Sequence, residues 1–395
     1  MKRIKNRLFF VIQPNYVWAY WIVVIDFPAR FCANQIDKRF NEHHPARPED
    51  RPLSQDRHTT SGPRPTLKTV AEIAGLAVTT VSRALANDPK IATATRQRVA
   101  EIARNIGYVP DRAAQRLRTG KTMVITLLLD GTQERISFGS TIIAGLTRAL
   151  QGTGYHLTVS PHLLAETPEE SVRYIMRNNL ADGVIFSRVE PFDKRVRLLS
   201  ERGFPFACHG RTEFSTPHPY VDFDNEAFAF AAANKLIKAG AKRICMIMPD
   251  SRFTFYQHLR YGLMRAVSDS GTDVVMPKEV TLDSSLAQIS SWANRIAKAP
   301  DRPDAFICPG EAAYVALMSG LRSAGLERGR DFQAVVKASS DLLKHIEPRI
   351  DLIYEDIEES GYLLGTHLLD AINPSDATPK QTLLAPTYGA PEPAG

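Results

Sequence analysis

One stretch of the chain, residues 66–122, constrains the fold more than any other, because its pattern fixes two short helices and the turn between them. Val70, Ile73 and Ala74 recur at helical spacing and predict a first amphipathic helix. Gly75 can adopt the positive φ that ends such a helix. A second apolar face follows at the same spacing, on Val78, Val81, Ala84 and Leu85. Two helices joined by so short a turn are typical of a helix-turn-helix unit.

The same stretch continues into a third helix and a basic segment. Residues 94–106 carry apolar side chains at helical spacing, and Gly107 predicts the end of that helix. Between residues 61 and 121 the chain has eleven Lys or Arg against four Asp or Glu, an excess larger than the net charge of +6 of the whole chain. Positive charge concentrated on one small domain indicates a partner that carries many phosphates, which points to nucleic acid.

The sequences TLKTVAEIAG, TTVSRAL and GYVPDRAAQRLRTGKT together resemble the lactose/galactose-repressor family of bacterial transcriptional regulators. The resemblance implies a three-helix DNA-binding domain over residues 66–109, which we call the head. It further implies a hinge helix and linker over residues 110–121, and an effector-binding and dimerisation core over residues 122–395. The partner that it implies is a double-stranded DNA operator of pseudopalindromic sequence, bound by a homodimer.

The head offers specific candidates for contacts with DNA. Val78 and Thr79 match the main specificity positions of the family, so we expect Val78 to meet a thymine methyl group and Thr79 a base edge. Arg83 is suited to pair with O6 and N7 of guanine. Thr66 is expected to cap the first helix, whose dipole then points at a phosphate. Ser82 and Tyr108 are expected to contact phosphate oxygens, with packing or solvent exposure as the alternative.

The basic segment after the head matches the hinge helix of the family at Asp111, Ala114 and Leu117. Leu117 is expected to insert into a step of the minor groove and bend the duplex, and the small Ala114 permits a close approach. A helix this short is marginal alone, so we expect it to form only when two copies meet on DNA. Asp111 stands where the family usually has Asn, and its charge is mildly unfavourable near phosphates.

From Met123 onward, apolar strands alternate with amphipathic helices. This order predicts parallel sheets with right-handed crossovers, and two such sets dividing near Asn225 predict two domains with a ligand cleft at the carboxyl ends of their strands. The expected fold class is α/β, with a three-helix helix-turn-helix head and a hinge helix joined to a two-domain core like that of periplasmic binding proteins. We expect the first subdomain at residues 122–222 plus 352–378 and the second at residues 223–351 plus 379–395.

Five residues that follow strands or begin helices are candidates for contact with an effector: Phe138, Arg211, Asp224, Arg260 and Glu311. An aromatic face such as Phe138 can stack on a sugar, although a place in the core is an equal alternative. Arg211 can form paired hydrogen bonds with hydroxyls or a carboxylate. Asp224 has the alternative of capping the helix that begins at Asn225. Histidines such as His209 and His258 are more often hydrogen-bonded or at the surface than in contact with a ligand.

Three departures from the family pattern leave the ligand class open. The pair that is commonly Asn-Asp is Gly310-Glu311, and the segment that is often Gly-(Phe/Tyr)-Asp is Lys337-Ala338-Ser339. Leu259 stands where an Arg is usual. A carbohydrate effector is therefore the first expectation, and a purine or nucleoside that acts as co-repressor is the alternative.

Residues 1–65 do not fit this plan. A basic start is followed by an apolar stretch that Gln13, Pro14 and Asn15 interrupt, so no continuous run long enough to cross a membrane exists there. Residues 34–65 are polar and rich in His, Arg and Pro, which is typical of disorder. We expect this extension to be disordered or to come from a mis-assigned start, with a membrane-tethered regulator as the alternative.

The function expected is that of a cytoplasmic, homodimeric transcriptional regulator that acts as a repressor and is controlled by a small molecule in the core cleft. A sugar-binding transport protein would share the core but would not carry the head. An enzyme is not expected, because the chain shows no nucleophile elbow, no Gly-rich phosphate loop in the right context and no metal constellation. No cofactor is expected, and the four scattered cysteines predict ordinary thiols in a reducing compartment.

Overall fold

The computed structural model describes residues 10–13, 16–19, 65–109, 116, 120–129, 138–161, 167–374 and 378–388. Contacts divide the chain into two compact units, residues 1–64 and residues 65–395. In the first unit the structure describes one antiparallel pair of strands, β1 (Phe10–Gln13) and β2 (Tyr16–Ala19). Asp111, Ala114 and Leu117 lie outside the described residues, so their roles in a hinge helix stay predictions. None of the described helices is both long and apolar enough to cross a membrane.

The head consists of α1 (Leu67–Ala74), α2 (Val78–Leu85) and α3 (Thr93–Asn105). Val70, Val81 and Val99 are fully buried where the three helices meet. Gly75 has a φ of 63° and ends α1 in the left-handed region, as the sequence predicts. The prediction for Ile73 is wrong, because its side chain is 52% exposed. Ala71 packs in its place, because the buried stripe of α1 runs through positions 70, 71 and 74.

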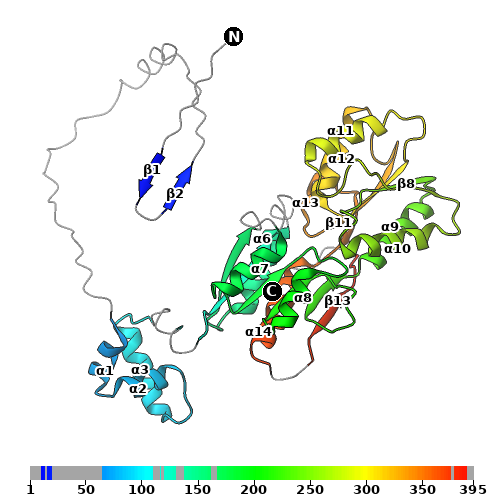
Figure 1. The fold of residues 1–395 in the computed structure, drawn as a ribbon. Helices are drawn as coiled ribbons and strands as arrows, with labels where there is room; N and C mark the ends of the chain where they lie inside the picture. Colours follow the sequence, from blue (N-terminus) through cyan, green and yellow to red (C-terminus); the bar gives the residue numbers. More distant parts are fainter. Residues whose placement is uncertain are drawn as a thin grey trace, which may run out of the picture. The chain divides into compact units, whose positions relative to one another are not determined.

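A first lobe follows the head, built on a six-stranded parallel sheet in the order β13-β7-β6-β5-β3-β4 (Figure 1). Its strands are β3 (Val124–Leu129), β4 (His156–Pro161), β5 (Gly183–Phe186), β6 (Phe206–His209), β7 (Tyr220–Phe223) and β13 (Gln381–Leu384). Its helices are α6 (Phe138–Leu150), α7 (Pro168–Arg177), α8 (Lys194–Arg202) and α14 (Ile357–Ile372). Side chains of β3 alternate between the two faces: Ile125, Leu127 and Leu129 pack with α6 and α14, and Leu128 packs with α7 and α8.

A second lobe has the same construction on a five-stranded parallel sheet in the order β12-β11-β10-β8-β9. Its strands are β8 (Arg243–Met246), β9 (Asp273–Val275), β10 (Ala305–Cys308), β11 (Gln333–Ala338) and β12 (Asp351–Tyr354). Its helices are α9 (Asn225–Lys238), α10 (Thr254–Val267), α11 (Leu286–Ile296), α12 (Glu311–Ser323) and α13 (Leu342–Ile346). Helices α9 and α10 cover one face, and α11 and α12 cover the other. The prediction of two α/β domains with parallel sheets is confirmed.

The predicted division of the carboxyl-terminal part between the lobes is wrong at two strands. Strand β13 pairs with β7 in the first lobe, whereas residues 379–395 were assigned to the second (in Figure 1, β13 is red beside green strands). Strand β12 pairs with β11 in the second lobe, so residues 352–354 do not belong to the first. Both are edge strands with a single neighbour in the sheet, and their short patterns do not reveal which sheet receives them.

Helices α6 and α14 cross at very close range through paired glycines. A Cβ atom on Gly145 would lie 1.9 Å from the carbonyl oxygen of Glu358, and one on Gly361 would lie 2.4 Å from that of Ile142. Glycine is required at both positions because the backbones occupy the space of a side chain. The crossing fixes α14 on the sheet, and the chain passes from β12 of the second lobe into α14 of the first.

Candidate functional site

The exposed side of α2 carries the three residues expected to read bases. Val78 is 42% exposed, and Thr79 and Arg83 are exposed as well. These positions lie within the first and second turns of α2, so their side chains emerge on adjacent parts of the helix surface. Ala77 caps α2 without a side-chain hydrogen bond, which leaves the amino-terminal N–H groups of α2 without that partner.

Arg83 is held by an ion pair within the head. Its Nε lies 2.8 Å from Oδ2 of Asp88, in the turn that follows α2. A hydrogen bond from the backbone N–H of Lys90, and then the one from Arg83, lower the pKa of Asp88 below its usual value. The Arg83 side chain is still 49% exposed, so its remaining N–H groups are available toward solvent. A contact with guanine therefore competes with this pair or uses the other edge of the guanidinium.

The other predicted head residues fall in different surroundings. Thr66 caps α1 in a reciprocal capping box: its hydroxyl accepts from the N–H of Thr69, and the Thr69 hydroxyl accepts from the N–H of Thr66. The prediction of an N-cap is confirmed. Tyr108 packs against the head core, and Ser82 is half-buried. Both positions are closer to the packing alternative than to full exposure.

A cavity of about 200 Å³ lies where the two lobes meet. Phe138 from the first lobe and Glu311 from the second both line it, as does Arg211 in the loop after β6. Three of the five candidates expected from the sequence therefore line this cavity. Glu311 begins α12, and its carboxylate accepts hydrogen bonds from the Ser339 hydroxyl at 3.1 Å and the Ser340 hydroxyl at 2.8 Å.

The other two candidates lie elsewhere. Asp224 caps α9, since its Oδ1 accepts from the N–H of Ala227 at 2.9 Å. That is the alternative foreseen from the sequence. Arg260 is exposed and does not line the cavity. Leu259 lies on the buried side of α10. The two residues beside it, His258 and Arg260, therefore project from opposite flanks of the helix. Of these two, His258 lines the cavity.

Sequence reasoning missed the polar cluster at the base of the cavity. Asp222, on β7, is 3% exposed, and its Oδ2 lies 3.4 Å from Nε of Arg211 and 4.0 Å from Nδ1 of His258. Burial raises the pKa of Asp222 to about 7, although the charge of Arg211 opposes the rise. Arg211 Nε also donates to Nε2 of His258 at 3.4 Å, which places the proton of a neutral imidazole on Nδ1. Burial lowers the pKa of His258 to about 4.

Lys337 contacts both of the segments through which the chain passes from one lobe to the other. Its ammonium forms an ion pair with Glu355, which follows β12, and donates to Oδ1 of Asn225 at 3.2 Å, which follows β7. Nε2 of His209 lies 3.6 Å from the same Glu355, and its ring meets the edge of Phe138 at 5.1 Å between centroids. Burial lowers the pKa of His209, so the ring is held neutral. The departure at Lys337 thus replaces a glycine of the family with a charged side chain at the connection.

The rim of the cavity is closed by contacts between the lobes. Arg188, in the loop after β5, pairs with Asp283 of the second lobe at 2.6 Å. The backbone N–H and hydroxyl of Thr254, at the start of α10, both donate to the carbonyl of Val189, at 3.0 and 3.1 Å. The loop that carries residues 188 and 189 therefore holds the second lobe against the first.

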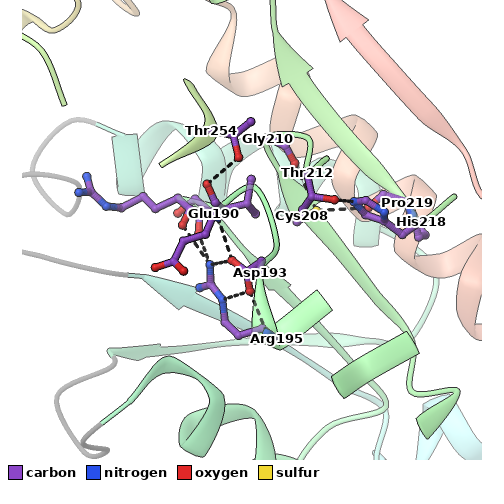
Figure 2. A network of polar contacts seen from close by, with 12 residues as sticks. Glu190, Asp193, Arg195, Cys208, Gly210, Thr212, His218, Pro219 and Thr254 are labelled. Atoms are coloured by element: carbon purple, nitrogen blue, oxygen red, sulfur yellow. Dashed lines mark hydrogen bonds and ion pairs between the residues drawn. The ribbon is translucent and has the colours of Figure 1, made fainter. Parts of the chain in front are cut away.

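A buried ion pair between Arg195 and Asp193 supports that loop (Figure 2). Arg195 donates to Oδ2 of Asp193 at 2.7 Å and to the carbonyls of Ser187 and Arg188 at 3.1 and 3.0 Å. Burial alone would raise the pKa of Asp193, but the hydrogen bonds and charge of Arg195 hold it below its usual value. Because breaking a buried, hydrogen-bonded ion pair is costly, this pair helps to hold the loop in one shape at the cavity rim.

The cavity thus combines an aromatic edge with donors and acceptors from both lobes, as expected of a small-molecule binding site. Among the described residues no group of three or more His, Cys, Asp or Glu side chains is placed to hold a metal ion.

Comparisons with known proteins agree with this construction. Residues 66–111 match the model of bacterial regulatory proteins of the lacI family, and residues 233–389 match that of the periplasmic binding protein-like domain. The transcriptional regulator AglR of Rhizobium meliloti (strain 1021) is 31% identical over 335 residues, which cover 80% of this chain and 90% of AglR. CelR of Thermobifida fusca is 28% identical over 331 residues, which cover 81% of this chain and 96% of CelR.

Solved structures share the fold. The lac repressor dimer bound to operator and the anti-inducer ONPF has a TM-score of 0.68 at 18% identity, covering 82% of this chain and 97% of that chain. The complex of CelR with cellobiose has a TM-score of 0.59 at 23% identity, covering 83% of this chain and 99% of that chain. These relatives are transcriptional regulators and not enzymes. With its head, its two lobes and its relative AglR, the chain belongs to the lacI family of bacterial regulatory proteins.

Proposed function

We propose that this protein is a cytoplasmic, homodimeric repressor that binds a pseudopalindromic operator and is controlled by a small carbohydrate in the cavity between its lobes. The observation that carries the proposal is the cavity itself, whose walls come from both lobes. A ligand that contacts both lobes favours the arrangement in which both contacts are made. The relative CelR was solved with cellobiose, a carbohydrate, and the lac repressor was solved on its operator, which supports both halves of the proposal.

The connection from cavity to DNA runs through the first lobe. The end of the linker is anchored there: Asp182 accepts hydrogen bonds from the N–H groups of Thr122 and Met123, at 2.7 and 2.9 Å. Lys121 donates to Oδ1 of Asn373, at the end of α14, at 2.7 Å. A change in the orientation of the first lobe therefore reaches the described end of the linker at residues 121–123, and in this proposal it continues from there toward the DNA. Effector and operator then influence each other's affinity by the same factor.

The test is a selection of bound duplexes from a random-sequence pool, followed by titration of the selected duplex with the full-length protein. We expect a pseudopalindromic consensus, binding of two copies of the chain, and a steep fall of affinity with salt. A neutral sugar that binds the core should then weaken the complex. Failure to select any sequence would overturn the DNA-binding role, and a nucleoside that strengthens the complex would replace the carbohydrate with a co-repressor.

A further inference from the structure

Three buried polar atoms on the cavity wall have no hydrogen-bond partner among the described residues. They are Oδ2 of Asp222, Nε2 of His209 and Nδ1 of His258. An unpaired polar atom in a buried site is costly, so three together at one cavity point to a partner that arrives from outside the chain. The set contains an acceptor, the carboxylate oxygen, and two imidazole nitrogens, of which Nδ1 of His258 carries a proton. A hydroxyl group can serve each of them, because it both donates and accepts.

Each cation on the wall already lies beside a carboxyl group, and Asp222, the partner of Arg211, is charged above about pH 7. Every Lys or Arg among the described residues that line the cavity lies against a carboxylate, and Glu311 adds one carboxylate without a cation. The pairs are Arg188 with Asp283, Arg211 with Asp222, and Lys337 with Glu355. An anionic ligand would have to displace one of these carboxylates or enter beside it in a site of low dielectric, where like charges repel strongly. A neutral ligand meets no such barrier.

We propose that the cavity selects a neutral, polyhydroxylated ligand over its acidic and phosphorylated derivatives, and that Asp222 is the specificity-determining contact. The inference rests on the proposed function, since it concerns the effector of that cavity. Oδ2 of Asp222 accepts a hydrogen bond from a ligand hydroxyl, and the adjacent His258 and Arg211 orient that carboxyl group. Oδ1 is already occupied by the N–H of Phe223 at 2.9 Å, so one oxygen alone is available to the ligand.

The test uses the full-length protein and matched probes: glucose beside glucuronate and glucose 6-phosphate, galactose beside galacturonate, and cellobiose beside cellobionate. Binding is measured by thermal shift and by titration calorimetry. We expect at least one neutral sugar to bind, and its charged derivative to bind about tenfold or more weakly. Asp222→Asn should weaken binding of the neutral sugar by roughly ten- to a hundredfold, because a hydrogen bond to a charged group is lost.

Asp301→Asn is the matched control, because Asp301 is an exposed carboxylate, paired with Arg243, that does not line the cavity. It should bind the sugar as the wild type does. Tighter binding of the charged derivative, unchanged affinity in Asp222→Asn, or no binding by any neutral probe would each overturn the inference. Operator binding by the same protein preparations reports on the proposed function separately, so a failure of one is distinguished from a failure of the other.

Discussion

Asp222 makes the stability of the first lobe depend on pH. Its pKa is about 7 in the folded protein and near 3.8 in an unfolded chain, so between these values the folded state holds one proton more. The free energy of unfolding should fall by about 1.4 kcal/mol per pH unit as the pH rises through this window, and the loss should end above about pH 7. The groups that face Asp222 are Arg211, His258, Glu355, Lys337 and the N–H of Phe223.

The measurement is the melting temperature of wild type and Asp222→Asn without ligand, from about pH 5 to about pH 8. The difference between the two proteins should change steadily up to about pH 7 and then level off, because Asn cannot titrate. Parallel curves for the two proteins over the whole range would show that Asp222 does not carry this proton.

Arg83 is the single side chain of the head whose loss should most reduce specificity. Arg83→Ala should weaken binding to the selected operator by about 1–3 kcal/mol, with little change in binding to unrelated DNA. Asp88→Asn is the matched variant, because it frees Arg83 from its ion pair and should leave specific binding unchanged or stronger. Titrations of labelled duplexes measure both. Equal affinity of Arg83→Ala and wild type for the operator would remove Arg83 from base recognition.

Between elements, the loop after β5 should control how readily the lobes separate. Arg188→Ala and Asp283→Ala each break the ion pair across the rim, and the pair is worth about 1 kcal/mol if it behaves as a partly exposed one. Spin labels on Tyr174→Cys of α7 and Tyr261→Cys of α10, both exposed, would report the distance between lobes. We expect a longer and broader distance distribution in each variant, and no further change when the two are combined.

The control for that experiment is Arg243→Ala, which removes an ion-pair network made within the second lobe alone. Its distance distribution should match that of the wild type. An unchanged distribution in Arg188→Ala would mean that the contacts of Thr254 with Val189 hold the lobes by themselves.

The crossing of α6 and α14 should tolerate no side chain at Gly145. Gly145→Ala would place a Cβ against the backbone of Glu358, and overpacking of this kind costs about 1–3 kcal/mol or more. Gly310→Ala is the comparison, because its nearest atom, in Leu282, lies at 4.0 Å. Thermal unfolding should show a loss for the first variant and little change for the second. Similar melting temperatures for both would mean that the two helices can move apart without loss.

For the whole molecule, β13 makes the carboxyl-terminal residues part of the first lobe. A chain that stops after residue 379 would lack this strand and its pairing with β7, whereas one that stops after residue 388 would keep it. We expect the shorter protein to lose cooperative unfolding of the first lobe and the longer one to melt like the full chain. Circular dichroism during heating distinguishes them, and equal melting of both would show that the sheet does not need β13.

The sequence was informative where the pattern was long and uniform. The helix expected to begin at Asn225 is found at Asn225–Lys238, and the apolar run after Met123 forms β3. Strand β7 was not recognised, because Asp222 interrupts its apolar pattern. Asp222 is buried and lines the cavity, and patterning rules often fail at positions of this kind.

The cavity was the part least accessible to sequence reasoning. Its polar wall joins His209, Asp222, His258, Lys337 and Glu355, which are distant in the chain and share no spacing. Phe138, Arg211 and Glu311 could be proposed because each follows a strand or starts a helix at the cleft edge. The partners that make them a site depend on how β6, β7 and β11 are brought together by the two sheets, which no local pattern records.

The late arrival of β13 also sets an order of events during synthesis. The head is complete at residue 109, but the first lobe needs residues 381–384 before its sheet has all six strands. At ordinary bacterial rates the ribosome takes on the order of tens of seconds to travel between these points. Each new chain therefore passes through a period in which a folded, positively charged head is already outside the ribosome while the sheet beside the cavity still lacks its edge strand β13.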